Sequence, residues 1–182
     1  MLVAYHPVTI AQDTLREADA LFAALDALPG QILFCFPNAD AGSRALIERT
    51  RLFAAKRSDA CVFVNLEVLA YWSLLRQVNL FLGNSSSGIM ETASFALPTV
   101  NVGLRQQGRE RAQNVIDSAA EAKSIIRAIA KARSPEFRKA LQGMSNPYGN
   151  GTAAETIVKV LTTVPLGEKL LFKRHREDFG SA

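Results

Sequence analysis

The residues best suited to chemistry lie in one short stretch, Gly83–Gly88, with the sequence GNSSSG. It separates an apolar run from a second run of apolar and small residues, which predicts a turn between a strand and a short helix. Hydroxyl and backbone N–H groups at the start of a helix bind phosphate oxygens, because the helix dipole makes that end positive. Glycines let the backbone approach a ligand closely. The stretch therefore predicts an anion site, and the alternative is a capped turn that binds nothing.

Two further polar features extend this hypothesis. Glu91 follows about one turn after the serines, where its carboxylate could accept hydrogen bonds from the neighbouring hydroxyls of a ribose. Three arginines, Arg105, Arg109 and Arg111, lie just past the next apolar run. Guanidinium groups match the oxygens of a diphosphate with several donors. A solvated basic loop is the simpler interpretation for any single arginine, and Arg105 lies nearest to the apolar run.

His6 ends the first apolar run, directly before Pro7. An imidazole there could donate to a phosphate or transfer a proton, but a single histidine is more often structural, so both roles stay open. The sequence lacks GxGxxG after the first apolar run and lacks GxxxxGK[ST], which argues against a nicotinamide cofactor and against a P-loop nucleotidase. No paired carboxylates at catalytic spacing are evident.

Alternating apolar runs and helical patterns must position these residues. Strands are predicted at residues 2–6, 31–38, 61–65, 78–83, 98–103 and 114–117. Apolar residues at helical spacing predict helices between them, as well as at 121–132, at 134–142 and from Thr152. Thr9 with Gln12 and Thr152 with Glu155 match the capping-box pattern at two helix starts.

Strands without polar alternation, separated by helices, indicate a parallel sheet covered on both faces. We therefore expect an α/β fold with a doubly wound parallel sheet over residues 1–165, and a helical or frayed tail over residues 166–182. Ligands of such sheets bind at the carboxyl ends of the strands. That rule brings His6, Asn38, Gly83–Ser87 and Arg105 to one edge.

Composition bounds the class of protein. The chain has 182 residues, of which 48% are hydrophobic and 21% charged, and its net charge of +4 is weak support for nucleic acid binding. The two cysteines, Cys35 and Cys61, lie in apolar runs and predict buried thiols of a reducing compartment. Two scattered histidines do not suggest a metal site. With no apolar stretch of about 18 residues and no charged leader, we expect a cytoplasmic protein that contacts no membrane.

Four segments carry a resemblance to a known family. They are YHPVT at Tyr5–Thr9, FPNADAGSR at Phe36–Arg44, the long stretch Gly83–Asp117, and NPYGNGTA at Asn146–Ala153. In order and spacing the chain resembles the hydrolysing UDP-N-acetylglucosamine 2-epimerase family over roughly Leu2 to Leu161. That family is similar to the two-domain GT-B glycosyltransferases, and the match is to its C-terminal half.

The resemblance implies that UDP binds in a cleft between two domains and that no metal or redox cofactor takes part. It implies a catalytic contact of His6 with the diphosphate or sugar, and contacts of Arg105 on the substrate side. The remaining UDP contacts that it implies are Asn38, Leu66, Ser85, Ser86, Ser87, Gly88 and Glu91. In the implied reaction, removal of the C2 proton and loss of UDP give a glycal, to which water adds with inversion at C2. The product is a free N-acetylmannosamine-type sugar.

The resemblance also implies partners. The N-terminal domain of the family, with its catalytic acids, has no counterpart in these 182 residues, so we expect this chain to be inactive alone and to need that domain or a partner chain. An interdomain face left uncovered is apolar, which predicts a homo-oligomer. Two alternatives stay open: a stand-alone nucleotide-binding or regulatory module, and a fragment of a GT-B glycosyltransferase.

Overall fold

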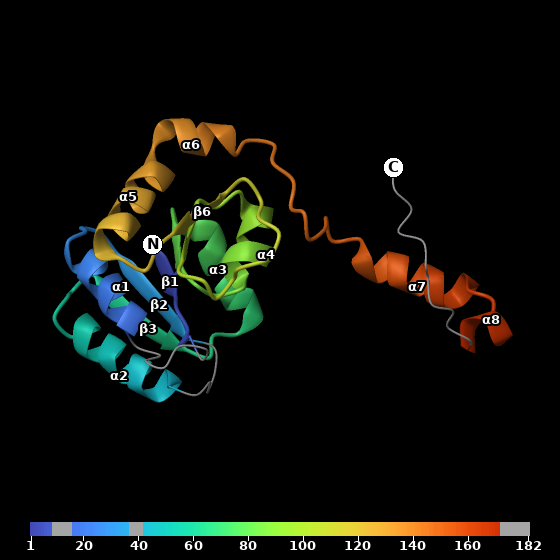
Figure 1. The fold of residues 1–182 in the computed structure, drawn as a ribbon, viewed down its shortest axis with the longest axis horizontal. Coiled ribbons are helices and arrows are strands. Elements are labelled where there is room, and N and C mark those ends of the chain that lie inside the picture. The colour runs from blue at the N-terminus through green and yellow to red at the C-terminus, as the bar shows by residue number, and fades with distance from the viewer. Residues whose placement is uncertain (9–15, 37–41, 172–182) are drawn as a thin grey trace. The chain divides into compact units, whose positions relative to one another are not determined.

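The computed structural model describes residues 1–8, 16–36 and 42–171 (Figure 1). The chain divides into two compact units, Met1–Tyr148 and Gly149–Ala182. The domain boundary that the sequence suggested, after residue 165, stays a prediction.

The first unit is built on a six-stranded sheet with the order β3-β2-β1-β4-β5-β6. All five neighbouring pairs of strands are parallel. This arrangement confirms the predicted doubly wound α/β fold. The strands are β1 (Leu2–Ala4), β2 (Ile32–Phe36), β3 (Ala60–Val64), β4 (Phe81–Gly83), β5 (Thr99–Val102) and β6 (Val115–Ser118).

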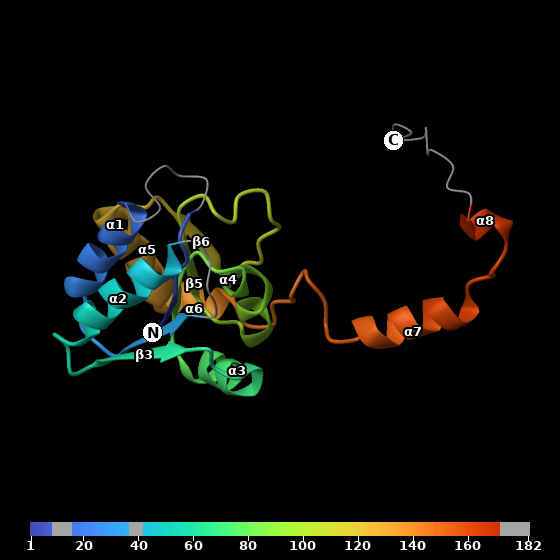
Figure 2. The same ribbon diagram turned by 90° about the horizontal axis from the view of Figure 1, so that it is seen from below.

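Helices cover both faces of the sheet, and the alternation of side chains along each strand supplies a core to each face. On one face, α1 (Arg16–Asp26), α2 (Ser43–Ala54) and α5 (Ala122–Arg133) pack on a core that includes Val3, Phe34 and Val100 (Figures 1 and 2). On the other face, α3 (Val68–Gln77) packs on a smaller core that includes Leu2, Ala4, Cys35 and Phe81.

The strand at the β3 edge is less buried than the sequence suggested. Cys35, on β2, is 5% exposed, as predicted. The prediction of a buried thiol at Cys61 was wrong, because β3 has a neighbour on one side only and Cys61 is exposed.

The chain reverses its winding between β1 and β4, where the backbones approach closely at Gly83. A Cβ atom at Gly83 would lie 2.0 Å from the carbonyl oxygen of Ala4, and φ of Gly83 is +147°. Only glycine fits this position, both for space and for backbone conformation. The glycine at the end of this apolar run is therefore required by the close contact between β1 and β4.

Short helices complete the first unit. The serine stretch enters α4 (Ser87–Met90) and the 3₁₀ turn η1 (Thr92–Phe95), and α5 is followed by α6 (Pro135–Ala140). The α6 helix is capped by Ser134, whose Oγ accepts a hydrogen bond from the N–H of Phe137 at 3.1 Å.

The second unit contains α7 (Ala153–Thr163) and α8 (Glu168–Leu171). Thr152 stands at the N-cap of α7, as predicted, but the capping box is wrong, because its side chain makes no cap bond and donates instead to Asn150 Oδ1 at 2.7 Å. The other expected capping box, Thr9 with Gln12, lies outside the described residues. The apolar stripe of α7, Ile157, Val158 and Leu161, is exposed.

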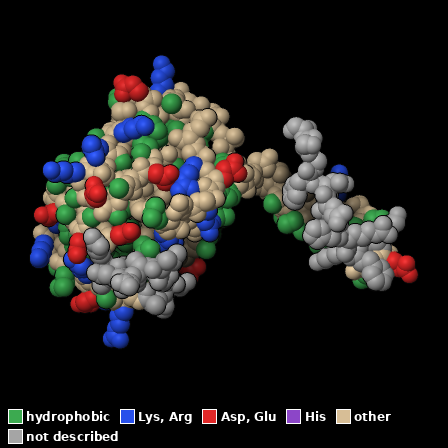
Figure 3. Space-filling view, viewed as in Figure 1, with side chains coloured by type: hydrophobic (Ala, Val, Ile, Leu, Met, Phe, Trp, Pro, Cys, Tyr) green, Lys and Arg blue, Asp and Glu red, His purple; other side chains and the backbone are tan. Residues whose placement is uncertain are grey.

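Charged side chains of both signs are interspersed over the face of the first unit seen in Figure 3. Among the described residues, no helix combines the length and hydropathy that a membrane span requires.

Candidate functional site

A pocket of about 360 Å³ lies at the carboxyl end of the sheet, where β1 and β4 separate. Five residues that the sequence assigned to ligand binding line it together: Leu66, Ser85, Ser86, Ser87 and Glu91. They come from the loop before α3 and from the loop and short helix after β4. Crevices of this kind are where doubly wound sheets bind ligands.

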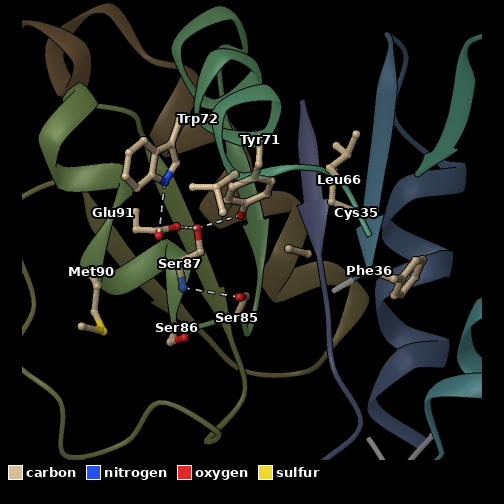
Figure 4. A pocket seen from close by; sticks show the side chains of 12 residues that line it. Cys35, Phe36, Leu66, Tyr71, Trp72, Ser85, Ser86, Ser87, Met90 and Glu91 are labelled. Atoms are coloured by element: carbon tan, nitrogen blue, oxygen red, sulfur yellow. Dashed lines mark hydrogen bonds between the residues drawn. The ribbon is translucent and has the colours of Figure 1, made fainter. Parts of the chain in front are cut away.

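One wall of the pocket is a chain of hydrogen bonds (Figure 4). Tyr71 donates from its hydroxyl to Ser87 Oγ at 2.7 Å, and Ser87 Oγ donates to Glu91 Oε2 at 2.6 Å. Trp72 Nε1 donates to the other oxygen, Glu91 Oε1, at 3.4 Å. Both oxygens of Glu91 are thus oriented, yet each carboxylate oxygen can accept a further bond. The fixed carboxylate suits a pair of neighbouring hydroxyl groups.

The opposite wall is apolar and comes from Cys35, Leu66 and Val68. Phe36 also borders the pocket, but its side chain packs into the core on the other face of the sheet (Figure 4). Burial raises the pKa of the Cys35 thiol to about 11. Burial is also the main cause that raises the pKa of Tyr71, with a smaller contribution from the charge of Glu91. Both groups are therefore neutral at physiological pH, and the wall is suited to a flat, weakly polar ring.

The backbone of the serine loop is used differently from what the sequence suggested. The N–H groups of Asn84 and Ser85 both donate to the carbonyl oxygen of Ala4, at 3.2 Å each. The helix that follows has only 4 residues, so its dipole is small. Two N–H groups of the predicted backbone cradle are therefore already occupied. Ser85 and Ser86 line the pocket, and their contact with an anion stays a prediction.

Gly88 faces the sheet. A Cβ atom there would lie 2.6 Å from Cε1 of Phe81 and 3.3 Å from Cγ2 of Thr99. Its small size lets α4 sit against β4 and β5, and its predicted contact with a ligand stays a prediction.

His6 and Arg105 meet at a common neighbour, Asn84. The side chain of Asn84 accepts from the N–H of His6 at 2.7 Å and donates to the carbonyl of His6 at 2.9 Å. The backbone carbonyl of Asn84 accepts from Arg105 Nη1 at 3.1 Å and from Gln106 Nε2 at 2.8 Å. The structure therefore brings the ends of β1, β4 and β5 together as expected, and the chemical roles of His6 and Arg105 stay predictions.

Asn38 lies outside the described residues. The sequence analysis missed Tyr71 and Trp72, and it placed Asn84 at the ligand edge of the sheet without giving it a role. Aromatic residues near the start of a helix that follows a strand could have indicated the first two. Among the described residues, no group of three or more His, Cys, Asp or Glu is placed to hold a metal ion.

Comparison with known proteins decides the family. The family model described as UDP-N-acetylglucosamine 2-epimerase matches residues 1–162. The chain belongs to the UDP-N-acetylglucosamine 2-epimerase family. Within this family, it is 34% identical over 174 residues to the UDP-N,N'-diacetylbacillosamine 2-epimerase (hydrolyzing) of Legionella pneumophila, covering 94% of this chain and 45% of that protein.

A second relative of this epimerase family is the GDP/UDP-N,N'-diacetylbacillosamine 2-epimerase (hydrolyzing) of Campylobacter jejuni. It is 38% identical over 141 residues, or 76% of this chain and 36% of that protein. The chain thus spans less than half the length of these curated relatives.

A solved structure shares the fold, the complex of S. aureus MnaA with UDP. It has a TM-score of 0.69 at 18% identity, covering 98% of this chain and 47% of that one. At this identity the likeness concerns the fold alone. It agrees with the prediction that the chain corresponds to one half of a GT-B-like enzyme.

Proposed function

We propose that this chain is the UDP-binding half of a hydrolysing UDP-sugar 2-epimerase. The observation that carries the proposal is the single pocket that unites Leu66, Ser85, Ser86, Ser87 and Glu91. In this proposal, the apolar wall receives the uracil ring, Glu91 accepts from the ribose hydroxyls, and Ser85 and Ser86 donate to the diphosphate. Hydroxyl donors and an oriented carboxylate are the groups that a nucleoside diphosphate needs.

The proposed reaction consumes one water per UDP-sugar. The C2 proton is removed and the bond between C1 and the diphosphate oxygen breaks, so that UDP leaves with the electron pair and a glycal forms. Water then gives its hydroxyl to C1 and a proton to C2 on the opposite face, which releases the C2-inverted sugar. His6 and Arg105 act on the diphosphate and sugar side, and the acids that move the C2 proton come from the other half of the enzyme.

For the sugar we propose a UDP-diacetamido sugar rather than UDP-N-acetylglucosamine. The two relatives described above, at 34% and 38% identity, are both named for a diacetylbacillosamine substrate. The free sugar would enter the synthesis of sialic-acid-like sugars, in the cytoplasm, where the free thiols of Cys35 and Cys61 stay reduced.

A titration with UDP tests the binding part of the proposal. The sequence contains one tryptophan, which is Trp72 at the pocket wall, so its fluorescence reports on this site alone. We expect UDP to change the emission in a saturable way. Inorganic diphosphate serves as the control, since it should bind far more weakly without the base and ribose. Absence of any change up to millimolar UDP, together with no binding by calorimetry, would refute the proposal.

Activity needs the whole enzyme. We expect a protein that joins this chain to the missing half to release UDP and a free C2-inverted sugar from a UDP-diacetamido sugar, measured by NMR. Transfer of the sugar to an acceptor with no free sugar released would favour a glycosyltransferase. UDP binding without any turnover in the joined protein would favour a regulatory module.

We also propose that the exposed apolar residues beside the pocket, Val68, Leu69 and Met90, contact the other half of the enzyme. In the isolated chain they would promote association between copies, because apolar patches of this kind are usually covered. Light scattering should therefore give a mass above 19.8 kDa at high concentration, and a strictly monomeric chain would contradict this part.

A further inference from the structure

We propose that Asn84 is a positioning residue that fixes the diphosphate-binding side of the pocket, because its side chain and its backbone carbonyl together tie the ends of three strands to one buried residue. The inference rests on the proposed binding of UDP and adds a residue that contacts neither the base nor the ribose in that proposal. Asn84 is 0% exposed and lies directly after β4, at the first residue of the serine loop.

The side chain of Asn84 holds the backbone on both sides of His6. Its Oδ1 accepts the N–H of His6 at 2.7 Å and its Nδ2 donates to the carbonyl of His6 at 2.9 Å. A side-chain amide is the one neutral group that offers a donor and an acceptor in this geometry. The pair of bonds crosses 78 residues of sequence, so that the end of β1 cannot shift relative to the serine loop without breaking both.

The backbone of Asn84 holds the third strand end. Its carbonyl accepts from Arg105 Nη1 at 3.1 Å and from Gln106 Nε2 at 2.8 Å, and both donors lie just past β5. Gln106 is itself 2% exposed, which makes this anchor rigid. A guanidinium that spends one N–H on Asn84 still has four donors for a ligand and a defined direction.

The contacts of Asn84 are separate from the wall that orients Glu91. Tyr71, Ser87 and Trp72 orient that carboxylate through side-chain hydrogen bonds that do not include Asn84. Loss of the Asn84 side chain should therefore free the end of β1 at His6 and let the peptide of residue 84, whose carbonyl holds Arg105, shift, while it leaves the ribose and base contacts in place. The expected result is a selective loss of affinity for the diphosphate part of the ligand.

The test compares UDP with uridine on the full 182-residue chain. For Asn84→Ala we expect UDP affinity to fall about tenfold or more and uridine affinity by no more than about twofold, since a buried bond pair is lost on one side of the site only. The matched control is Asn101→Ala. Asn101 is another buried asparagine, 2% exposed, at the end of β5, and its amide donates to Asp117 Oδ1 at 2.7 Å. Asn101→Ala should change the free energy of unfolding but not the ratio of the affinities for UDP and uridine.

A double-mutant cycle provides a second readout that a purely structural role would not move. If the Asn84 side chain fixes the backbone carbonyl that directs Arg105, then Arg105→Ala should weaken UDP binding severalfold in the parent chain and by less than about twofold in the Asn84→Ala background. If Asn84→Ala does not fold, Asn84→Ser, whose hydroxyl can keep one bond to His6, replaces it in both comparisons.

The outcomes separate the two claims. A parent chain that fails to bind UDP refutes the proposed function and this inference with it. A parent that binds UDP, with variants that weaken UDP and uridine equally or with additive effects of Asn84 and Arg105, refutes the inference alone.

Discussion

The turns that end β4 and β3 share one backbone feature but differ in burial. Both strands end at or before a residue with positive φ, Gly83 at +147° and Asn65 at +56°. At β4 the turn is buried against β1 and carries the pocket with Ser85, Ser86 and Glu91. At β3 the turn is exposed, and a cavity of about 450 Å³ beside it is lined by Arg44, Glu48 and Arg51.

The difference shows what makes a strand end into a site. Cavity volume does not decide it, since the cavity at β3 is the larger of the two. The β4 end lies beside β1, at the place where the winding of the sheet reverses. Buried hydrogen bonds fix the polar groups there. The β3 end lies at an edge of the sheet, where the charged side chains of Arg44, Glu48 and Arg51 are exposed. Five substitutions or measurements sharpen this comparison.

The largest effect is expected for Gly83→Ala. A Cβ atom 2.0 Å from the Ala4 carbonyl oxygen must push β1 and β4 apart, and we expect a loss of about 4 kcal/mol or more in the free energy of unfolding. Urea denaturation followed by circular dichroism measures it. Gly30→Ala is the matched control: φ is +108° but nothing lies within 4 Å, so only backbone strain of about 1–3 kcal/mol applies. Equal losses for the two variants would show that the strand contact is unimportant.

The next effect concerns ligand binding. Glu91→Gln keeps the shape of the side chain but removes the charge that accepts the ribose hydroxyls, so UDP affinity should fall about tenfold, measured by calorimetry. The loss should be smaller for 2′-deoxy-UDP, which offers one hydroxyl fewer. Glu48→Gln, at the β3 cavity, should leave UDP affinity unchanged. A similar effect of both substitutions would mean that the loss reflects overall charge.

The rates at which Cys35 and Cys61 are alkylated compare the pocket with the edge strand β3. Burial raises the pKa of Cys35 from 9.0 to about 11, so at pH 9 about 1% of it is thiolate. Iodoacetamide should therefore modify exposed Cys61 at least about tenfold faster, measured by peptide mass spectrometry. Bound UDP should slow Cys35 further and leave Cys61 unchanged, and protection of Cys61 would place the ligand at the wrong end of the sheet.

The raised pKa of Cys35 also makes the free energy of unfolding depend on pH. An unfolded thiol ionises near pH 9, whereas folded Cys35 holds its proton until about pH 11. The unfolded state therefore loses protons first, and the contribution of this group to folding falls as the pH rises through that window. Cys35→Ala should reduce the alkaline loss of stability relative to the parent.

The smallest effect is expected for Asn65→Gly. The residue is exposed with φ of +56°, a conformation that glycine adopts without strain. The free energy of unfolding should change by no more than about 0.5 kcal/mol, because relief of strain offsets the added freedom of the unfolded chain. A large change would mean that the β3 end is as constrained as the β4 end.

Much of the fold could be predicted from sequence, because the strands are apolar runs and the helices between them are periodic. All six predicted strands are present; four are shorter than predicted, and the third and sixth keep their predicted length but are shifted by one residue. The failures have physical causes. Cys61 looks buried in an apolar run, but strand order decides which strand lies at an edge, and order is not written in a local pattern. Thr152 and Glu155 match a capping box, but Asn150 competes for the threonine hydroxyl.

The site could be predicted in part. Ser85, Ser86 and Glu91 stand out because their residue types and spacing suit a nucleotide. Tyr71 and Trp72 do not, since an aromatic residue on a helix is more often part of a core. Asn84 was present in the serine stretch, but its role depends on His6, which is 78 residues away in the sequence.

One carbonyl oxygen, that of Ala4, accepts the amides of both Asn84 and Ser85. A displacement of this carbonyl would free both N–H groups, so we expect their exchange in deuterated water to be correlated. The position of the serine loop thus depends on the position of one peptide at the end of β1.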